Sequence, residues 1–193
     1  NQFIVHSTDG DGLYHKETYS DVVNATWAGR LKIDKDLGLS PPENWSFRYK
    51  FGNKILIPVD PEEVPSITMV QGPFGDVVNF KDKGVFLSWY PTGRTGWSEE
   101  LVPPAWDSDL TDEQRMDIFK KSVEQMALRI PSVKNLRYEP ENVSPVGGVI
   151  YALGNQDVDI VNSKLHMRYQ AGIESHGNYH TINTGKYTLI PYL

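Results

Sequence analysis

Side chains capable of binding and proton chemistry gather near the end of the sequence, between residues 163 and 191. The stretch holds an arginine, a lysine and three histidines: Arg168, Lys186, His166, His176 and His180. Apolar and polar residues alternate from Lys164 to Tyr169, which predicts a half-buried strand. Arg168 lies opposite apolar Met167 on that strand, so its side chain must face water or a partner. A carboxylate is the best partner for a guanidinium, and Arg168 is therefore a candidate binder of an acidic group.

The histidines also allow a metal site, because imidazole is a common ligand for zinc and other transition metals. His176 and His180 are four residues apart, with Glu174 and His166 nearby. That spacing places two side chains on one face of a helix, whereas here a Gly-Asn turn at Gly177 intervenes, so the spacing does not secure the geometry. We therefore expect no metal at these residues.

A second candidate for acid binding is the pair Tyr90 and Arg94, which follows the apparent strand from Gly84. A guanidinium binds a carboxylate through two parallel hydrogen bonds, and a phenol adds another donor. The alternative is a surface arginine beside a half-buried tyrosine. The run from Arg48 to Lys50 alternates along another strand, and we interpret it as a solvated face, with cofactor contact as the minor alternative.

Two further stretches have the pattern of ligand-binding turns. Val22 to Thr26 is short, apolar and β-branched, which favours a central strand, and ligands in open α/β sheets collect at the carboxyl ends of such strands. Near the end of the chain, Thr184 to Thr188 follows another extended segment and can open a helix. The first backbone N–H groups of a helix lack partners within it and attract electron-rich atoms.

These stretches together resemble FAD-dependent oxidoreductases of the D-amino-acid oxidase superfamily. The residues that carry the resemblance to its C-terminal signature are Arg168, Gly172, Gly177, Asn178, Tyr179, His180, Thr184, Gly185, Lys186, Tyr187, Thr188 and Pro191. The run from Asp21 to Trp27, followed by Gly29, is similar to the strand that re-enters the FAD domain in that superfamily.

The resemblance implies a flavoenzyme that moves a hydride from an amine or hydroxy substrate to FAD. It implies FAD contacts at two sets of residues: Asn24, Ala25, Thr26 and Trp27, then Gly185, Lys186, Tyr187 and Thr188. Arg168, Arg94 and Tyr90 would hold the substrate. His180 would have a polar or proton-handling role nearby.

The sequence lacks the G-x-G-x-x-G turn that cradles the pyrophosphate in dinucleotide-binding domains. The nearest glycine-rich pieces, Gly147-Gly148 and the run from Asp9 to Gly12, have neither the spacing nor a following helix. The chain thus resembles the C-terminal, substrate-domain half of such an enzyme. We expect weak or absent FAD binding and no catalysis from the isolated chain, and a missing FAD-binding segment as its partner in cis or in trans.

The expected strands and helix that position these residues indicate an α+β fold with a mainly antiparallel sheet. Strands at close spacing are expected over residues 46–51, 54–58, 66–71, 84–90 and 146–154, with a turn at Gly52-Asn53. One long amphipathic helix is expected from Asp112 to Arg129, with Thr111 and Gln114 forming a capping box. Residues 1–45 and 146–193 resemble the FAD-domain side and residues 46–145 the substrate domain, and we expect one compact unit.

Composition narrows the class of protein further. The 193 residues include no cysteine and carry a net charge of −6, so a disulfide framework, a thiolate metal site and a Cys nucleophile are excluded. The acidic balance without a basic cluster argues against nucleic acid, and no apolar run approaches the roughly 18 residues of a membrane span. The compartment stays open, with the cytoplasm favoured.

A different class of function rests on Trp89, Trp97 and Trp106. Three tryptophans in so short a span can form a stacking platform for a carbohydrate or a protein partner. The alternative function is therefore a non-enzymatic binding module. Such a module needs no upstream G-x-G-x-x-G segment, whereas the flavoenzyme does.

Overall fold

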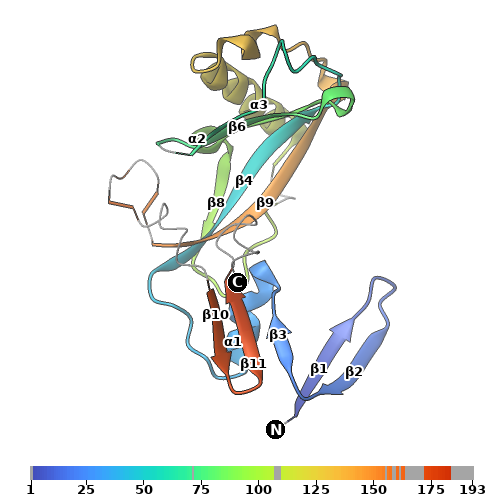
Figure 1. Ribbon diagram of the computed structural model, residues 1–193, viewed down its shortest axis with the longest axis vertical. Helices are drawn as coiled ribbons and strands as arrows, with labels where there is room; N and C mark the ends of the chain where they lie inside the picture. The colour runs from blue at the N-terminus through green and yellow to red at the C-terminus, as the bar shows by residue number, and fades with distance from the viewer. Residues whose placement is uncertain are drawn as a thin grey trace. The chain divides into compact units, whose positions relative to one another are not determined.

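The protein divides into two compact units in a computed structural model (Figure 1). The structure describes residues 2–70, 72–106, 110–154, 156–157, 160, 162–163 and 172–183. Unit 1 is built from both ends of the chain, residues 1–43 and 167–193, and unit 2 is the single stretch 44–166. The expected α+β class is confirmed: antiparallel strands dominate, and one long helix accompanies them.

Unit 2 contains a six-stranded antiparallel sheet organised around the long strand β4 (Trp45–Ile55). Strand β9 (Val143–Leu153) pairs with β4 along its whole length, from Trp45 opposite Leu153 to Ile55 opposite Val143. On its other side β4 pairs first with β8 (Arg94–Ser98) and then with β7 (Val85–Trp89). The sheet continues through β6 (Gly75–Asn79) to β5 (Ile67–Met69). Residues 146–153, which the sequence grouped with the chain ends, thus belong to the sheet of unit 2.

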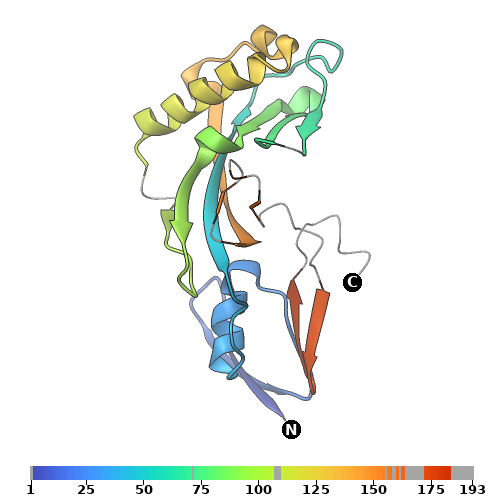
Figure 2. The same ribbon diagram turned by 90° about the vertical axis from the view of Figure 1, so that its left-hand side faces the viewer.

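Helix α3 (Asp112–Ala127) packs against β7 and β4 and closes the main hydrophobic core (Figure 2). The predicted capping box is present, since Thr111 accepts from the Gln114 N–H and the Gln114 side chain accepts from the Thr111 N–H. Phe119 and Met126 on the helix are fully buried against residues of the sheet. A core of this kind lets unit 2 hold its own strands in register.

Unit 1 contains two small sheets. Strands β1 (Phe3–Thr8) and β2 (Tyr14–Tyr19) form a hairpin whose turn contains Asp9 to Gly12. Strands β10 (Gly172–His176) and β11 (Tyr179–Asn183) form a second hairpin, and β11 pairs in parallel with β3 (Val22–Asn24). A short 3-10 turn, Trp27–Gly29, leads from β3 into helix α1 (Arg30–Asp36).

Three expectations differ from the structure. The turn predicted at Gly52-Asn53 is wrong, because β4 runs through it; a Cβ at Gly52 would lie 2.4 Å from the Phe86 ring, so only glycine fits there. Helix α1 covers residues 30–36, where no helix was predicted. The one-turn helix α2 (Tyr90–Gly93) replaces a simple turn after β7. The strand predicted over residues 164–169 lies outside the described residues.

None of the described helices has both the length and the apolar character needed to cross a lipid bilayer.

Candidate functional site

The predicted pair Tyr90 and Arg94 lies at the two ends of α2, which connects β7 to β8. Tyr90 is the first residue of this short helix, and Arg94 opens the following strand. Gly93 permits the tight connection, since a Cβ there would lie 2.3 Å from the Phe51 carbonyl oxygen of β4. The backbone of β4 therefore fixes the position from which Arg94 extends.

Arg94 already contacts a carboxylate. Its Nε lies 2.5 Å from Oδ2 of Asp157, whose side chain is only 12% exposed, whereas the Arg94 side chain is 36% exposed. A carboxylate is the partner that the sequence predicted for this guanidinium, and here the protein itself supplies it. The Asp157 carboxylate thus lies beside both Arg94 and Tyr90.

The Tyr90 side chain is buried, with 1% of the residue exposed. Burial is the main cause that raises the pKa of Tyr90 above its ordinary value, and the nearby Asp157 carboxylate raises it further. An ordinary phenol is already protonated at neutral pH, and this shift extends the protonated range to higher pH. A protonated phenol is a hydrogen-bond donor, as binding of an anionic group requires.

Arg48 also lies in this region, which the sequence pattern did not predict. The expected solvated face is wrong here, because Arg48 is completely buried in β4. Its guanidinium carbon lies 4.0 Å from the ring centre of Trp97, and its Nη2 donates to the carbonyl oxygens of Gly154 and Gln156 at 3.3 and 3.1 Å. Trp97 is directly opposite Arg48 in the β4–β8 register. The alternation of charge along residues 48–50 resembled a solvent face, and only the pairing with β8 and β9 reveals the burial.

Two guanidiniums therefore share the region around one tryptophan ring, since the Arg94 guanidinium carbon also lies 5.9 Å from the Trp97 ring centre. A buried cation is costly to desolvate and increases the attraction for a nearby anion. Within unit 2, Arg48, Tyr90, Arg94, Trp97 and Asp157 form what we call the Arg94 cluster. Its charge and donor groups suit a carboxylate with a flat or apolar neighbour.

In unit 1, the parallel pairing of β3 with β11 brings together segments more than 150 residues apart. Tyr179 is opposite Val22 and Thr181 is opposite Asn24. Because the two strands run in the same direction, Asn24 and Asn183 end them at the same edge of the sheet. Ala25 and Thr26, which follow β3, are exposed at this edge. Gly185, Lys186, Tyr187 and Thr188 follow β11 closely in the sequence but lie outside the described residues, as does Arg168.

The edge is held in place by a buried polar cluster around Asp34 of α1. Its Oδ1 accepts hydrogen bonds from Asn24 Nδ2 at 2.8 Å and from the Tyr179 hydroxyl at 2.6 Å, and its Oδ2 accepts from Thr181 Oγ1 at 3.0 Å. Asn24, Asp34 and Thr181 are each 5% exposed or less. The Asn24 side chain is thus engaged within the protein.

Trp27 and His180 are the remaining predicted site residues that the structure describes. Trp27 has a positive φ of 51°, which turns the chain from β3 toward α1. His180 lies on β11, and its Nδ1 shares a hydrogen bond of 2.8 Å with Ser175 Oγ on β10. Tyr90 and Arg94 are in unit 2, so the structure groups those two residues and leaves His180 with unit 1. Among the described residues there is no group of three or more His, Asp or Glu side chains able to hold a metal ion.

The predicted tryptophan platform is wrong, because two of its three rings are covered. Trp89 is 3% exposed, with the Arg129 guanidinium carbon 4.1 Å from its ring centre. Trp106 is 9% exposed, and its ring lies against Tyr49 and so close to Gly96 that a Cβ there would be 2.4 Å away. Trp97 is half-buried beneath Arg48. These rings fill space inside unit 2 and do not offer a stacking surface.

Comparison with known proteins shows a distant structural similarity. No protein-family model matches the sequence, and neither does any curated protein. Among solved structures, the chain is similar to an FAD-dependent oxidoreductase from Pseudomonas aeruginosa, with a TM-score of 0.46 and 13% identity. The match covers 98% of this chain and 48% of the Pseudomonas chain, so this chain spans about half the length of the protein it resembles.

Proposed function

We propose that this chain is the substrate-binding half of an FAD-dependent oxidoreductase whose substrate carries a carboxylate. In the complete protein, hydride would pass from an amine or hydroxy carbon of the substrate to FAD. The dinucleotide-binding segment would be supplied in cis or in trans.

The observation that carries the proposal is the parallel pairing of β3 with β11. It ends both strands on the same side of the sheet, at Asn24 and Asn183, and the residues that the resemblance assigns to FAD, 24–27 and 185–188, begin at or follow these ends in the sequence. Ligands of α/β sheets bind outside the carboxyl ends of parallel strands, which supports a cofactor site at this edge.

The residues at this edge fit a cofactor. Ala25 and Thr26 are exposed, and Thr26 donates its hydroxyl proton to Asn24 Oδ1 at 2.7 Å, which leaves lone pairs on its oxygen for a ligand donor. Asn24 is anchored from behind by Asp34. When bound, the flavin supplies the hydride-accepting chemistry, and the chain supplies binding and orientation.

The Arg94 cluster supports the carboxylate part of the proposal. Arg94 would bind the substrate carboxylate, and the Tyr90 hydroxyl would donate a hydrogen bond to it. The buried charge of Arg48 would increase the attraction for this carboxylate. In the present structure the Asp157 carboxylate contacts Arg94. Substrate would therefore compete with Asp157 for the guanidinium.

The cofactor part is tested by titrating FAD into this chain and into the parent reading frame extended upstream, while flavin fluorescence and the thermal midpoint are followed. We expect only the extended protein to bind. Thr26→Glu should abolish binding in the extended protein, because it places a negative charge at the edge where FAD brings its own. The matched control is Thr18→Glu, at an exposed position of the β2 strand. Failure of both proteins to bind FAD would contradict the proposal.

The substrate part is tested with propionate, followed by the change in tryptophan fluorescence as Trp97 responds. Asp157→Asn should tighten propionate binding by about tenfold or more, since a charge-assisted hydrogen bond contributes about 1.5–3 kcal/mol and its internal competitor is removed. Arg94→Leu should abolish binding, and Arg137→Leu, at an exposed arginine, should leave it unchanged. Equal affinities in all three variants would exclude the Arg94 cluster as the acid site and leave the FAD result unaffected.

A further inference from the structure

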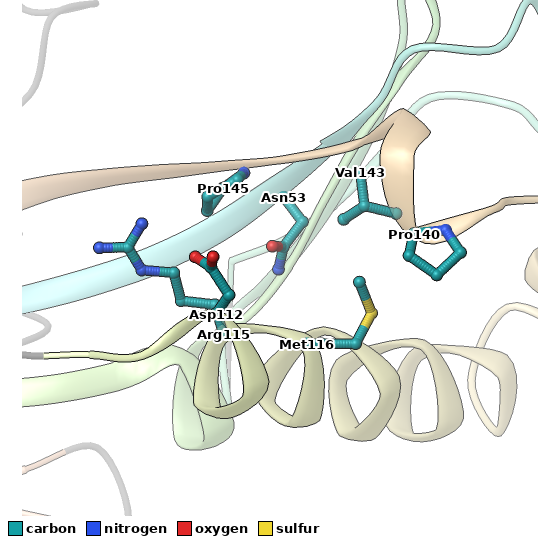
Figure 3. A pocket seen from close by; sticks show the side chains of 7 residues that line it. All are labelled: Asn53, Asp112, Arg115, Met116, Pro140, Val143 and Pro145. Carbon is teal, nitrogen blue, oxygen red and sulfur yellow. The ribbon is translucent and has the colours of Figure 1, made fainter.

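A pocket of about 410 Å3 lies between α3 and the β4–β9 edge of the sheet in unit 2 (Figure 3). It is lined by Asn53 of β4, by Asp112, Arg115 and Met116 of α3, and by Pro140, Val143 and Pro145. A volume of this size holds a small organic molecule. The pocket contains one cation, one anion, one amide and an apolar wall.

Asn53 is the unusual member of this set. The residue is 2% exposed, and its Nδ2 is buried without a hydrogen-bond partner among the residues that the structure describes. Figure 3 shows its amide directed from β4 toward α3, into the space beside Asp112 and Met116. Leaving a buried donor unsatisfied is costly, so a partner from outside the protein would recover that free energy.

The two charged groups lie one turn apart at the start of α3. Asp112 is exposed, and Arg115 is half-buried with its guanidinium carbon 5.9 Å from the Phe51 ring centre. The positive end of the α3 dipole adds to the attraction for an anion at this end of the helix. A ligand that satisfies the whole lining must offer an acceptor to Asn53 and Arg115, a cation to Asp112, and an apolar body to Met116 and Val143.

We propose that this pocket binds a free α-amino acid with an apolar side chain. The carboxylate would accept from Asn53 Nδ2 and interact with Arg115, the ammonium group would contact Asp112, and the side chain would lie along Met116, Val143 and the two prolines. This site is separate from the Arg94 cluster: Arg48 and Asn53 are five residues apart on β4, and alternation directs their side chains to opposite faces. The inference is independent of the proposed flavin chemistry.

The test uses the full chain and three probes that share one side chain: L-leucine, L-leucinamide without the carboxylate, and N-acetyl-L-leucine without the ammonium charge. Calorimetric titration and the thermal midpoint report binding. We expect L-leucine to bind one-to-one and both derivatives to bind at least about tenfold more weakly, since each loses a charge-assisted contact. No heat with L-leucine, or equal affinity for the three probes, would overturn the proposal.

Variants assign the contacts. Asp112→Asn and Arg115→Gln should each weaken L-leucine binding by about tenfold or more. The matched control is Asp117→Asn, whose exposed carboxylate on the same helix pairs with Lys121. Asn53→Leu should abolish binding while raising the thermal midpoint of the ligand-free chain, because it removes a buried unsatisfied donor. Undiminished binding in Asn53→Leu, or in both helix variants, would overturn the proposal.

Discussion

Tyr90 and Tyr179 each bury a phenol, and both residues are 2% exposed or less. Burial is the first cause that raises the pKa of both; Asp157 adds to it at Tyr90 and the hydrogen bond to Asp34 adds to it at Tyr179. A tyrosine in the unfolded chain ionises near pH 10. Both hydroxyls thus remain protonated in the folded protein at a pH where the unfolded chain has lost these protons.

This difference predicts a loss of stability at alkaline pH. The stabilising contribution is complete below about pH 10 and declines above it, because the unfolded state then binds fewer protons than the folded state. Each tyrosine contributes a slope of up to about 1.4 kcal/mol per pH unit to the free energy of unfolding. Urea unfolding across about pH 9 to 12 measures it, and Tyr90→Phe and Tyr179→Phe should each reduce the slope.

Exposed Tyr14 gives the control for this experiment, because its replacement by Phe removes a phenol that is 58% exposed. We expect Tyr14→Phe to keep the slope of the parent chain. If the slope also survived in the double variant of Tyr90 and Tyr179, the alkaline loss of stability would have another origin.

At the scale of single elements, α1 is joined to β3 and β11 chiefly through Asp34. Removing one partner of a buried charged network leaves the remaining groups unsatisfied. We expect Asp34→Ala to lower the free energy of unfolding by about 3–5 kcal/mol, measured by urea denaturation. Asp36→Ala, two residues later, breaks only the exposed pair with Lys32 and should cost about 1 kcal/mol or less. Equal costs for the two variants would show that the Asp34 cluster does not hold the edge.

Local sequence patterns predicted the elements that depend on their own residues. The α3 helix has its capping box and its apolar positions in one segment, and the hairpin β1–β2 has its Asp-Gly turn, so both were predictable. The continuous strand β4 was not, because Gly52-Asn53 has the composition of a turn and is kept extended only by pairing with β7 and β9. Helix α1 was not predicted, because two of its buried residues, Arg30 and Asp34, are charged. The helix therefore lacks the apolar periodicity that marks an inward-facing side.

The same division applies to the candidate site. Tyr90 and Arg94 were found because they are four residues apart in a single turn. Arg48 and Asp157 were missed, since they reach Trp97 and Arg94 only through long-range strand pairing and a distant loop. The edge formed by β3 and β11 was foreseen only as two separate stretches, and their adjacency is a property of the parallel pairing.

At the scale of the whole molecule, the two units differ in how the chain builds them. Unit 2 is one uninterrupted stretch with its own core, whereas unit 1 needs both ends, because β3 pairs with β11. Removal of residues 167–193 should therefore disorder the unit 1 partner of β11 and leave the fold of unit 2 intact. The indole NMR signals distinguish the two, since Trp27 belongs to unit 1 and the other four tryptophans to unit 2.

We expect the Trp27 signal alone to move to its unfolded position in this truncated chain. The thermal transition of unit 2 should keep its midpoint within a few degrees. Loss of dispersion for all five indole signals would mean that the two units fold only together.

A stretch that interrupts another unit and has its own hydrophobic core is topologically an insert. Evolution or a designer can then exchange residues 44–166 for another such insert while the interleaved ends, with their shared sheet edge, stay as they are. The Arg94 cluster and the pocket beside α3, with the ligands that we propose for them, would be exchanged together. A single exchange of residues 44–166 would then change the ligand preference. The sheet edge that we propose for FAD would stay the same.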